Sequence, residues 1–386
     1  MTENPVKLQS EYCSKCLICY SICPFEAISL NKETGDLILD IEKCQVCGLC
    51  FSACPSSSIE IAYYETSMLS SCVEKMRKDN LMLICKGSMI NPQVRESLKK
   101  HGILDDNSLQ LYVPCIGRIP PEFLLKALKN GVKKIVIVPC ESDKCRFNVG
   151  SNVGVFRLIL LQRLLRQIGL DSDALFFYRY FIRAQINRHK CIGCGNCAYT
   201  CPGNAIKIVS PGIAQIDEES CLGCGACVSV CPALAINLEG FENDLILGAI
   251  SRYRPLIEEI KVERKKPVIA VFYCQWANFP APDKYFTYTE DNVIFFEVPC
   301  SSMINPLYVL KAFYEGFDGI LIAACKKSEC KFEKGNEIAE KHIKALKDIL
   351  KQINLGGKLE ICFVAPRYLG ELDNQIKLFI EKLNNK

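Results

Sequence analysis

Two long parts of the chain alternate short apolar runs, rich in valine, isoleucine and leucine, with stretches whose apolar positions recur at helical spacing. Such runs are typical of strands buried on both faces of a sheet. Strands that alternate with helices predict a small parallel sheet with helices on its faces. The expected strands are 81–85, 109–113, 134–138 and 175–178, then 268–273, 293–298, 319–323 and 359–364. The expected helices are 121–130, 155–168, 306–315 and 337–353.

Two shorter segments are dense in cysteine, and amphipathic stretches at 67–78 and 242–260 are expected to connect them to the sheet segments that follow. The whole arrangement occurs twice. At an offset of 185 residues, Cys115 matches Cys300 and Cys140 matches Cys325. A module of about 180 residues is therefore duplicated in tandem. We expect four domains, at 1–63, 64–182, 183–240 and 241–386.

The chain has 386 residues, 26 cysteines and a formal net charge of +4. It contains no apolar run long enough to cross a membrane, and its first residues lack the pattern of a signal or transit peptide. We therefore expect a cytoplasmic protein without a membrane span, whose reduced thiols bind metal rather than form disulfides. No run of five or more Lys and Arg residues is present, so nucleic-acid binding is not expected.

Sixteen cysteines form four runs with the spacing C-x2-C-x2-C-x3-C-P. This spacing lets one tight loop wrap three thiolates around a cubane, while the fourth cysteine points the other way. The runs resemble the bacterial two-cluster ferredoxins, in which the fourth cysteine of each run ligates the other cluster. The resemblance implies four [4Fe–4S] clusters, held by Cys13, Cys16, Cys19 and Cys54; by Cys44, Cys47, Cys50 and Cys23; by Cys191, Cys194, Cys197 and Cys231; and by Cys221, Cys224, Cys227 and Cys201. A zinc ribbon, built from two C-x2-C knuckles, is the alternative.

The first run departs from the other three at the residue that follows its second cysteine. That residue is Gly48, Gly195 or Gly225 in three runs and Leu17 in the first. We hypothesise that the Leu17 side chain excludes water from the first cluster and thereby shifts its reduction potential.

Eight further cysteines recur as two widely spaced sets, Cys85, Cys115, Cys140 and Cys145, then Cys274, Cys300, Cys325 and Cys330. The first three of each set end or follow predicted strands, and the carboxyl ends of parallel strands meet at one edge of a sheet. A helix is expected to begin just beyond the fourth, near Gly150 or Gly335, and its amino end would favour an anionic cluster. Spacing alone leaves a [2Fe–2S] cluster and zinc open.

The second of these segments resembles the iron–sulfur delta subunit of the methyl-viologen-reducing hydrogenase family. The resemblance covers 268–386 and rests on Cys300-Ser-Ser-Met-Ile-Asn-Pro, Lys311-Ala-Phe, the run from Gly316 to Cys325, Cys330-Lys-Phe and Gly335-Asn336. Residues 81–182 match more weakly, since 141–144 and Gly150-Ser151 are looser fits. In that family the domain carries one [2Fe–2S] cluster and passes electrons from a hydrogenase or formate dehydrogenase to the flavin subunit of heterodisulfide reductase. The resemblance therefore implies a [2Fe–2S] cluster in each copy.

The second copy departs from the first after Cys274. The stretch 275–291 contains Pro280 and Pro282 where the first copy offers a helix, so the partner surface there is expected to differ. Trp276 is expected to shield the cluster, to anchor a partner or to fill the core.

Five other residues that often serve as ligands lie outside these patterns. Cys362 is expected to fill the core, because Phe177 takes its place in the first copy, and Cys72 is expected to be inert. The histidines, His101, His189 and His342, are too scattered for metal ligation; His189 is expected to be a solvated residue rather than one that tunes a cluster.

The chain contains no dinucleotide fingerprint, P-loop or nucleophile elbow, so no catalytic residue is expected. We interpret it as an α+β and α/β multidomain protein, with two ferredoxin-like domains alternating with two small parallel-sheet domains. Its expected function is that of an iron–sulfur electron-transfer protein within a larger complex. Its partners would be a flavin-containing heterodisulfide reductase-like subunit, hydrogenase or dehydrogenase subunits, or both. Six bound clusters would bring the net charge to about −8. The alternatives are a cluster-dependent disulfide-reducing enzyme and a zinc-stabilised binding module.

Overall fold

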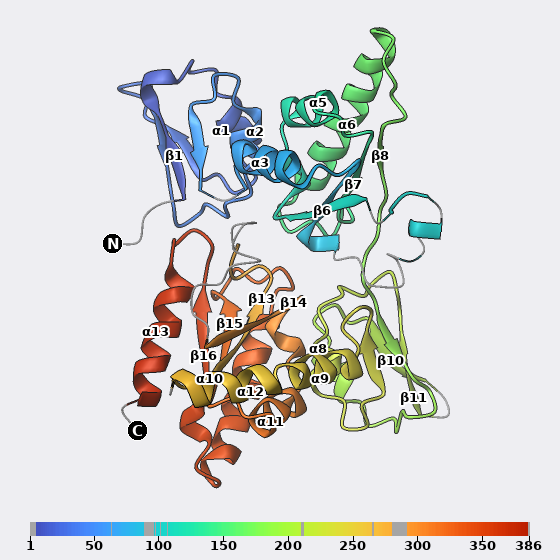
Figure 1. The fold of residues 1–386 in the computed structure, drawn as a ribbon, viewed down its shortest axis with the longest axis vertical. Coiled ribbons are helices and arrows are strands. Elements are labelled where there is room, and N and C mark those ends of the chain that lie inside the picture. The colour runs from blue at the N-terminus through green and yellow to red at the C-terminus, as the bar shows by residue number, and fades with distance from the viewer. Residues whose placement is uncertain are drawn as a thin grey trace. The chain divides into compact units, whose positions relative to one another are not determined.

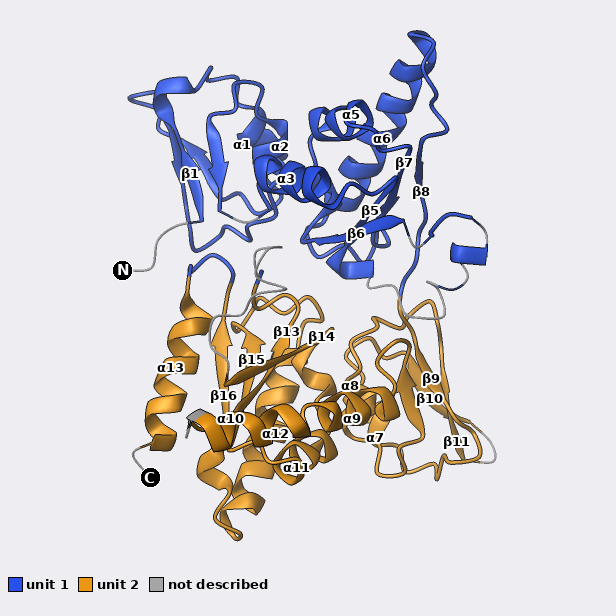
Figure 2. Ribbon diagram, viewed as in Figure 1, with its two compact units in different colours: residues 1–181, 279–286, 366–369 blue, residues 182–278, 287–365, 370–386 orange. Residues whose placement is uncertain are grey.

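The structure is a computed structural model that describes residues 5–62, 64–88, 96, 98–100, 102–105, 107–209, 212–264, 266–279 and 292–384. The ribbon in Figure 1 follows the chain from its N-terminus to its C-terminus. The chain divides into two compact units, which Figure 2 shows in different colours. The first consists of residues 1–181, 279–286 and 366–369, and the second consists of residues 182–278, 287–365 and 370–386. None of the helices in the described ranges combines the length and the hydropathy that a membrane crossing requires.

The cysteine-dense part of the first unit consists of two short antiparallel strand pairs and two short helices. Strand β1 (Val6–Leu8) pairs with β4 (Ile59–Ile61), and β2 (Ile28–Leu30) pairs with β3 (Leu37–Leu39). Helices α1 (Ile18–Ile22) and α2 (Leu49–Ala53) pack against each other. Apolar residues of these elements, such as Ile28, Leu49 and Ile61, are buried and form a small core.

The second unit repeats this arrangement. Strand β9 (Ala184–Ile186) pairs with β12 (Ile236–Leu238), and β10 (Ile206–Val209) pairs with β11 (Ile213–Ile216), again antiparallel. Helices α7 (Asn196–Thr200) and α8 (Ala226–Ser229) pack together as α1 and α2 do. The equivalence of the two segments follows from the duplicated sequence.

Each unit also contains a four-stranded parallel sheet, as the apolar runs predict. In the first unit the order is β6-β5-β7-β8, formed by Ser108–Val113, Asn80–Cys85, Lys134–Val138 and Leu175–Phe177. In the second unit the order is β14-β13-β15-β16, formed by Val293–Val298, Ile269–Cys274, Gly319–Cys325 and Leu359–Val364. The central strands β13 and β15 are buried throughout, because helices cover both faces. The strand predictions are confirmed to within two residues at each end.

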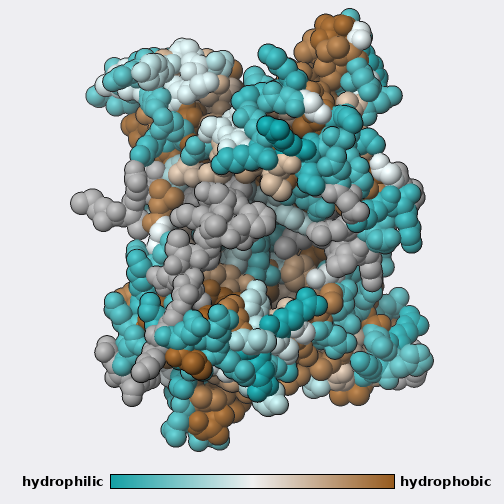
Figure 3. Space-filling model, viewed as in Figure 1, coloured by the Kyte–Doolittle hydropathy of each residue, from teal (hydrophilic) through white to brown (hydrophobic). Residues whose placement is uncertain are grey.

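The helices that cover the sheets also lie where the sequence predicts them. They are α5 (Pro121–Lys129) and α6 (Gly150–Gln167) in the first unit, and α11 (Pro306–Tyr314) and α12 (Gly335–Lys351) in the second. Helix α13 (Glu371–Asn384), which is not among the predicted helices, packs against β15 and β16. Helices α5 and α11 begin with a proline at their first position, where the missing N–H group costs no hydrogen bond. Helix α6 leaves Phe156, Leu160 and Leu164 exposed, and Figure 3 shows an apolar patch over its carboxyl end.

The connecting stretches are helical. Helix α3 (Thr66–Met76) connects the two parts of the first unit. The stretch 242–260 of the second unit is not one helix but two, α9 (Asn243–Arg252) and α10 (Arg254–Arg264), which meet at Tyr253. The break is explained by Pro255, which has no N–H to donate to the preceding turn and is well accommodated in the first turn of the new helix.

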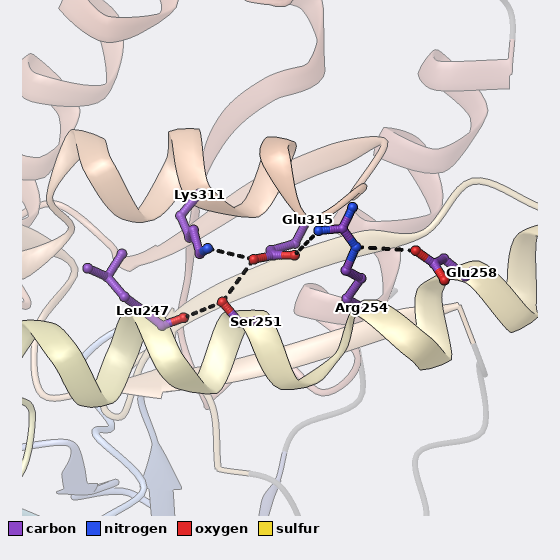
Figure 4. A network of polar contacts seen from close by, with 6 residues as sticks. All are labelled: Leu247, Ser251, Arg254, Glu258, Lys311 and Glu315. Atoms are coloured by element: carbon purple, nitrogen blue, oxygen red, sulfur yellow. Dashed lines mark hydrogen bonds and ion pairs between the residues drawn. The ribbon is translucent and has the colours of Figure 1, made fainter.

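A network of polar contacts fixes these two connecting helices to α11 (Figure 4). The buried Glu315 carboxylate accepts a hydrogen bond from the Ser251 hydroxyl at 2.8 Å. It also pairs with Lys311 at 2.6 Å and with Arg254 at 3.3 Å. In the first copy the carboxylate of the ion pair lies on the connecting helix instead. There Glu74 of α3 pairs with Lys126 of α5. Ion pairs therefore join a connecting helix to α5 in the first copy and to α11 in the second, and the connecting helix supplies the carboxylate in the first copy and the cation in the second.

Candidate metal centres

Each C-x2-C-x2-C run folds as a tight loop that leads into a short helix. The residue two positions after the first cysteine has a positive φ in all four runs, at Lys15, Val46, Gly193 and Gly223. The residue that precedes the helix also has a positive φ, at Leu17, Gly48, Gly195 and Gly225. This left-handed backbone turns the loop back on itself, so that three cysteine side chains point to one side. Glycine adopts it without strain, whereas Leu17 does so at a cost of about 1 kcal/mol.

Four cavities lie beside these loops, and each is lined by three cysteines of one run and the fourth cysteine of the other run in the same unit. The linings are Cys13, Cys16, Cys19 and Cys54; Cys44, Cys47, Cys50 and Cys23; Cys191, Cys194, Cys197 and Cys231; and Cys221, Cys224, Cys227 and Cys201. The structure thus brings together the four sets that the ferredoxin resemblance implies. The four cavities, with the open space at their mouths, have volumes of about 570, 350, 320 and 330 Å³.

The two cavities of each pair differ in exposure. We call the sets that begin with Cys13 and Cys191 the outer sites, because Cys16 and Cys194 are exposed to solvent. We call the sets that begin with Cys44 and Cys221 the inner sites. In the inner sites burial raises the pKa of Cys47 and of Cys224 to about 12. Since a thiol with such a pKa is protonated at neutral pH, thiolates in the inner sites require a positively charged occupant.

Backbone amides donate hydrogen bonds to the sulfur of the fourth cysteine in every run. The donors are Ala27 to Cys23 at 3.4 Å, Ser58 to Cys54 at 3.3 Å, Ala205 to Cys201 at 3.3 Å and Ala235 to Cys231 at 3.2 Å. Sequence reasoning missed these donors. In the sequence, the feature that marks these donors is an alanine or serine four residues after each cysteine that precedes a proline. Such bonds favour the thiolate form and would raise the reduction potential of a bound cluster.

Cys54 has two hydroxyl neighbours that the other fourth cysteines lack. Ser58 Oγ lies 3.2 Å and Ser56 Oγ 3.6 Å from its sulfur. Although burial acts in the opposite direction, these hydroxyls and the Ser58 amide lower the pKa of Cys54. The outer site of the first unit is therefore better prepared to hold an ionised fourth cysteine.

The widely spaced cysteines also converge, at the carboxyl edge of each sheet. Cys85 ends β5, Cys115 follows β6 and Cys140 follows β7. Strands β6 and β7 lie on opposite sides of β5, so this edge contains the point where the strand order reverses, which is where such sheets bind ligands. Burial and then the neighbouring thiolates of Cys145 and Cys47 raise the pKa of Cys115. We call this group, with Cys145, the sheet site of the first unit.

The sheet site of the second unit has the same construction. Cys274 ends β13, and its sulfur lies 3.5 Å from that of Cys325, which ends β15. Hydrogen bonds with Cys274 and Cys330, followed by burial, raise the pKa of Cys300. Trp276 is buried, with the Lys331 ammonium 5.2 Å from its ring centre, so it fills the core and does not form a surface anchor. Residues 280–291, which include Pro280 and Pro282, lie outside the described residues.

The amino end of a long helix closes each sheet site, at the glycine that the sequence predicts. A Cβ atom on Gly150 would lie 2.5 Å from Cys115 Sγ, and one on Gly335 would lie 2.5 Å from Cys300 Sγ. Only glycine therefore allows the helix to approach the sulfurs this closely. The helix dipole at this end favours a negatively charged occupant, as a thiolate-bound cluster would be. The next residue holds the cysteine loop in place, since Ser151 Oγ donates to the Cys140 carbonyl at 2.5 Å and Asn336 Nδ2 donates to the Cys325 carbonyl at 3.0 Å.

Within each unit the three sites follow one another. In the first unit, the influence of Cys47 on the pKa of Cys115 places the inner site beside the sheet site. In the second unit, Cys330 likewise acts on Cys224, and Cys197 of the outer site acts on Cys227 of the inner site. The order is outer, inner, sheet.

The other candidate ligands among the described residues take no part in these sites, and His101 lies outside the described residues. Cys362 is buried within β16, and burial raises its pKa to about 12, as expected for a thiol in the core. Cys72 lies on α3. His342 lies on α12, where its Nδ1 is 3.4 Å from Ser229 Oγ. In the part of the chain that the structure describes, no three His, Cys, Asp or Glu side chains come close enough to share a single metal ion.

Comparison with known proteins agrees with this geometry. The family model described as the methyl-viologen-reducing hydrogenase delta subunit matches residues 84–187 and again 269–385. Two models described as 4Fe-4S dicluster domains match 12–58 and 184–238. Two [4Fe–4S] dicluster domains and two parallel-sheet domains are thus established, and the expected fold class is confirmed.

Curated relatives include two kinds of protein. The chain is 33% identical over 256 residues to a subunit of the ferredoxin:CoB-CoM heterodisulfide reductase of Methanosarcina mazei. It is 32% identical over 122 residues to an iron-sulfur subunit of the F420-non-reducing hydrogenase vhu of Methanococcus maripaludis. The first match covers 65% of this chain but only 30% of the relative, whereas the second covers 31% of this chain and 91% of the relative.

Proposed function

The chain belongs to the family of the methyl-viologen-reducing hydrogenase delta subunit, and from this premise we propose that it is an iron–sulfur subunit that relays electrons between redox partners. The observation that carries the proposal is the order of the sites. In each unit an exposed four-cysteine site adjoins a buried one, which in turn adjoins a third at the edge of a sheet. A row of sites that leads from solvent into the protein suits electron transfer.

We assign six clusters to these sites. The four cysteine-lined cavities would hold [4Fe–4S] clusters through the sixteen cysteines that line them. The two sheet sites would hold [2Fe–2S] clusters through Cys85, Cys115, Cys140 and Cys145, and through Cys274, Cys300, Cys325 and Cys330. The glycine at the start of α6 or α12 supports this assignment, because it lets the amino end of the helix approach the cysteine sulfurs, where the helix dipole favours an anionic cluster. When bound, such clusters supply reversible one-electron transfer.

The protein contributes three things to that chemistry. The thiols bind the clusters, the amides of Ala27, Ser58, Ala205 and Ala235 stabilise negative charge on the sulfurs, and burial of the inner sites excludes water. The proposed division into domains is 1–63, 64–182, 183–240 and 241–386. The first and third would exchange electrons through their exposed outer sites.

The names of the relatives suggest the partners. We propose that the sheet domains dock on a heterodisulfide reductase-like subunit that contains flavin, and that a hydrogenase or dehydrogenase subunit supplies or receives the electrons. The test is anaerobic purification followed by metal analysis. The assignment requires about 20 iron atoms per chain and little zinc, with electron paramagnetic resonance signals of both cluster types. A colourless protein that contains zinc would contradict it.

The competing function is a disulfide-reducing enzyme that uses a sheet cluster. It predicts steady turnover of a disulfide by the isolated chain with a chemical reductant, whereas the relay predicts none without a partner subunit.

A further inference from the structure

The junction between the inner site and the sheet site is built from equivalent elements in the two units. A single 3-10 turn follows the second sheet cysteine, at η3 (Ile116–Arg118) and at η5 (Ser301–Met303). The turn packs against α2 in the first unit and against α8 in the second. The offset of 185 residues pairs Arg118 with Met303 and Arg157 with His342. The duplicated junction therefore carries cationic side chains in one copy that the other copy lacks.

Arg118 lies between two candidate cluster sites and is only 1% exposed. A Cβ atom on Gly48, which follows Cys47, would lie 3.0 Å from its Nε atom. Cys115 of the sheet site and Cys47 and Cys50 of the inner site are close enough to act on its charge, and its guanidinium lies 5.7 Å from the centre of the Tyr64 ring. Burial lowers the pKa of Arg118, but an arginine keeps its charge in a protein. The side chain is thus a fixed buried cation beside both sites.

The second unit places a neutral side chain at the same point. Met303 is fully buried, and its Cβ lies 2.6 Å from the position that a Cβ atom of Gly225 would take. Gly225 follows Cys224 as Gly48 follows Cys47. The packing against the inner loop is therefore preserved while the charge is absent.

Arg157 and His342 are a second pair of equivalent residues that differ in charge, and again the cation lies in the first unit. Arg157 donates hydrogen bonds to Ser52 Oγ and to the Gly117 carbonyl, both at 2.7 Å, and its charge interacts with Cys115 and also with Glu122. Its counterpart His342 contacts Ser229, the counterpart of Ser52. Burial lowers the pKa of His342, so its ring is neutral near pH 7.

Lysines near the fourth sheet cysteine of the second unit place positive charge beside its sheet site. They oppose the difference that Arg118 makes between the two units, but more weakly. The loop of the second unit carries Lys326, Lys327 and Lys331, which are partly or fully exposed, and the first two pair with Glu371 and Glu340. In the first unit Lys144 pairs with Glu141. Water screens these charges and carboxylates pair with two of them, whereas Arg118 is buried away from water.

We propose that Arg118 raises the reduction potentials of the two clusters that flank it, so that the inner and sheet clusters of the first unit are easier to reduce than their counterparts beside Met303. A reduced cluster carries one more negative charge than an oxidised one, and a buried cation stabilises that charge through a low dielectric. The two relays are then not equivalent, and electrons available to both collect in the first. This inference rests on the proposed function.

The test compares the holoprotein with three variants, Arg118→Met, Met303→Arg and Arg118→Lys, by anaerobic redox titration followed by electron paramagnetic resonance. In Arg118→Met the ratio of reduced to oxidised cluster at a fixed potential falls about tenfold, or about 59 mV, for one [4Fe–4S] signal and one [2Fe–2S] signal. Arg118→Lys retains most of the wild-type value, and Met303→Arg shifts a different pair of signals upward.

Iron content separates failure of this inference from failure of the proposed function. A wild-type chain without iron–sulfur clusters would overturn both. Variants that keep the wild-type iron content but leave every midpoint unchanged would overturn the role of Arg118 alone, as would equal shifts of all signals. If Arg118→Met loses iron, Met303→Arg decides, because it adds a charge and removes no cluster contact.

Discussion

Gly335, the first residue of α12, lies so close to Cys300 that a Cβ atom on it would be 2.5 Å from the cysteine sulfur. The same Cβ atom would lie 3.1 Å from the sulfur of Cys330. We expect Gly335→Ala to displace the helix end and to remove the sheet cluster of the second unit, a loss of about two iron atoms per chain. The four [4Fe–4S] signals and the other [2Fe–2S] signal should remain.

The matched control is Gly248→Ala on α9, where nothing lies within 4 Å of the added atom. This substitution should leave the iron content unchanged and should stabilise the helix slightly, since alanine has the higher helix propensity. Full retention of both [2Fe–2S] signals in Gly335→Ala would contradict the assignment of Cys300 and Cys330 as ligands.

The Glu315 network gives a prediction about stability. The hydrogen bond from Lys311, together with Ser251 and Arg254, lowers the pKa of Glu315 below its ordinary value of 4.5. A lowered carboxyl pKa stabilises the fold above the ordinary pKa, and this stability is lost as the pH falls through the lower, folded-state value. Between pH 6 and 8 the contribution is therefore constant. Because Lys311 and Arg254 are partly exposed, we expect Glu315→Gln to lower the free energy of unfolding by only about 1–2 kcal/mol.

The measurement is guanidinium unfolding of the holoprotein under anaerobic conditions at pH 6, 7 and 8. Glu258→Gln serves as the control: Glu258 pairs with the same arginine, but its side chain is 68% exposed, so the change should stay within about 0.5 kcal/mol. A loss in Glu315→Gln that varies strongly across this pH range would show that another group is responsible.

The sequence predicts the sheets well, because their strands follow from local patterns. The apolar runs predict the buried strands β5 and β13. Cys85 and Cys274 end these strands and therefore lie at the carboxyl edge of each sheet. The glycines that start α6 and α12 are likewise visible as breaks before amphipathic stretches.

The junction residues could not be predicted in this way. Arg118 is buried because α2, which lies far from it in sequence, packs over η3, whereas an arginine is normally exposed. The amide donors to the fourth cysteines depend on a turn with positive φ, at Glu26, Ser57, Asn204 and Leu234, which are residues without a marked preference for it apart from Asn204. Long-range packing and backbone strain of this kind leave little trace in hydrophobic periodicity.

Leu17 offers a direct test of how the outer clusters differ. Its backbone has a φ of 61°, and its side chain lines the outer cavity of the first unit. In Leu17→Gly the relief of backbone strain and the loss of buried apolar surface oppose each other, so stability should change by less than about 1 kcal/mol. Water should reach the cluster more easily and stabilise its more negative reduced form, so the midpoint should rise. A redox titration in which the outer-cluster midpoint does not move would disprove the shielding role of Leu17.

The crossed arrangement of the ferredoxin-like sites can be tested by a double substitution. Cys16 and Cys54 line one cavity although they belong to different runs, whereas Cys16 and Cys23 belong to one run and line different cavities. If each cavity holds one cluster, Cys16→Ala/Cys54→Ala should lose about four iron atoms, and Cys16→Ala/Cys23→Ala should lose about eight. Ligation within each run predicts the reverse. Cys72→Ala/Cys362→Ala is the control and should lose none, because neither residue lines a cysteine site. The loss should affect only the signals of the first unit, since the second pair of cavities is built from separate elements.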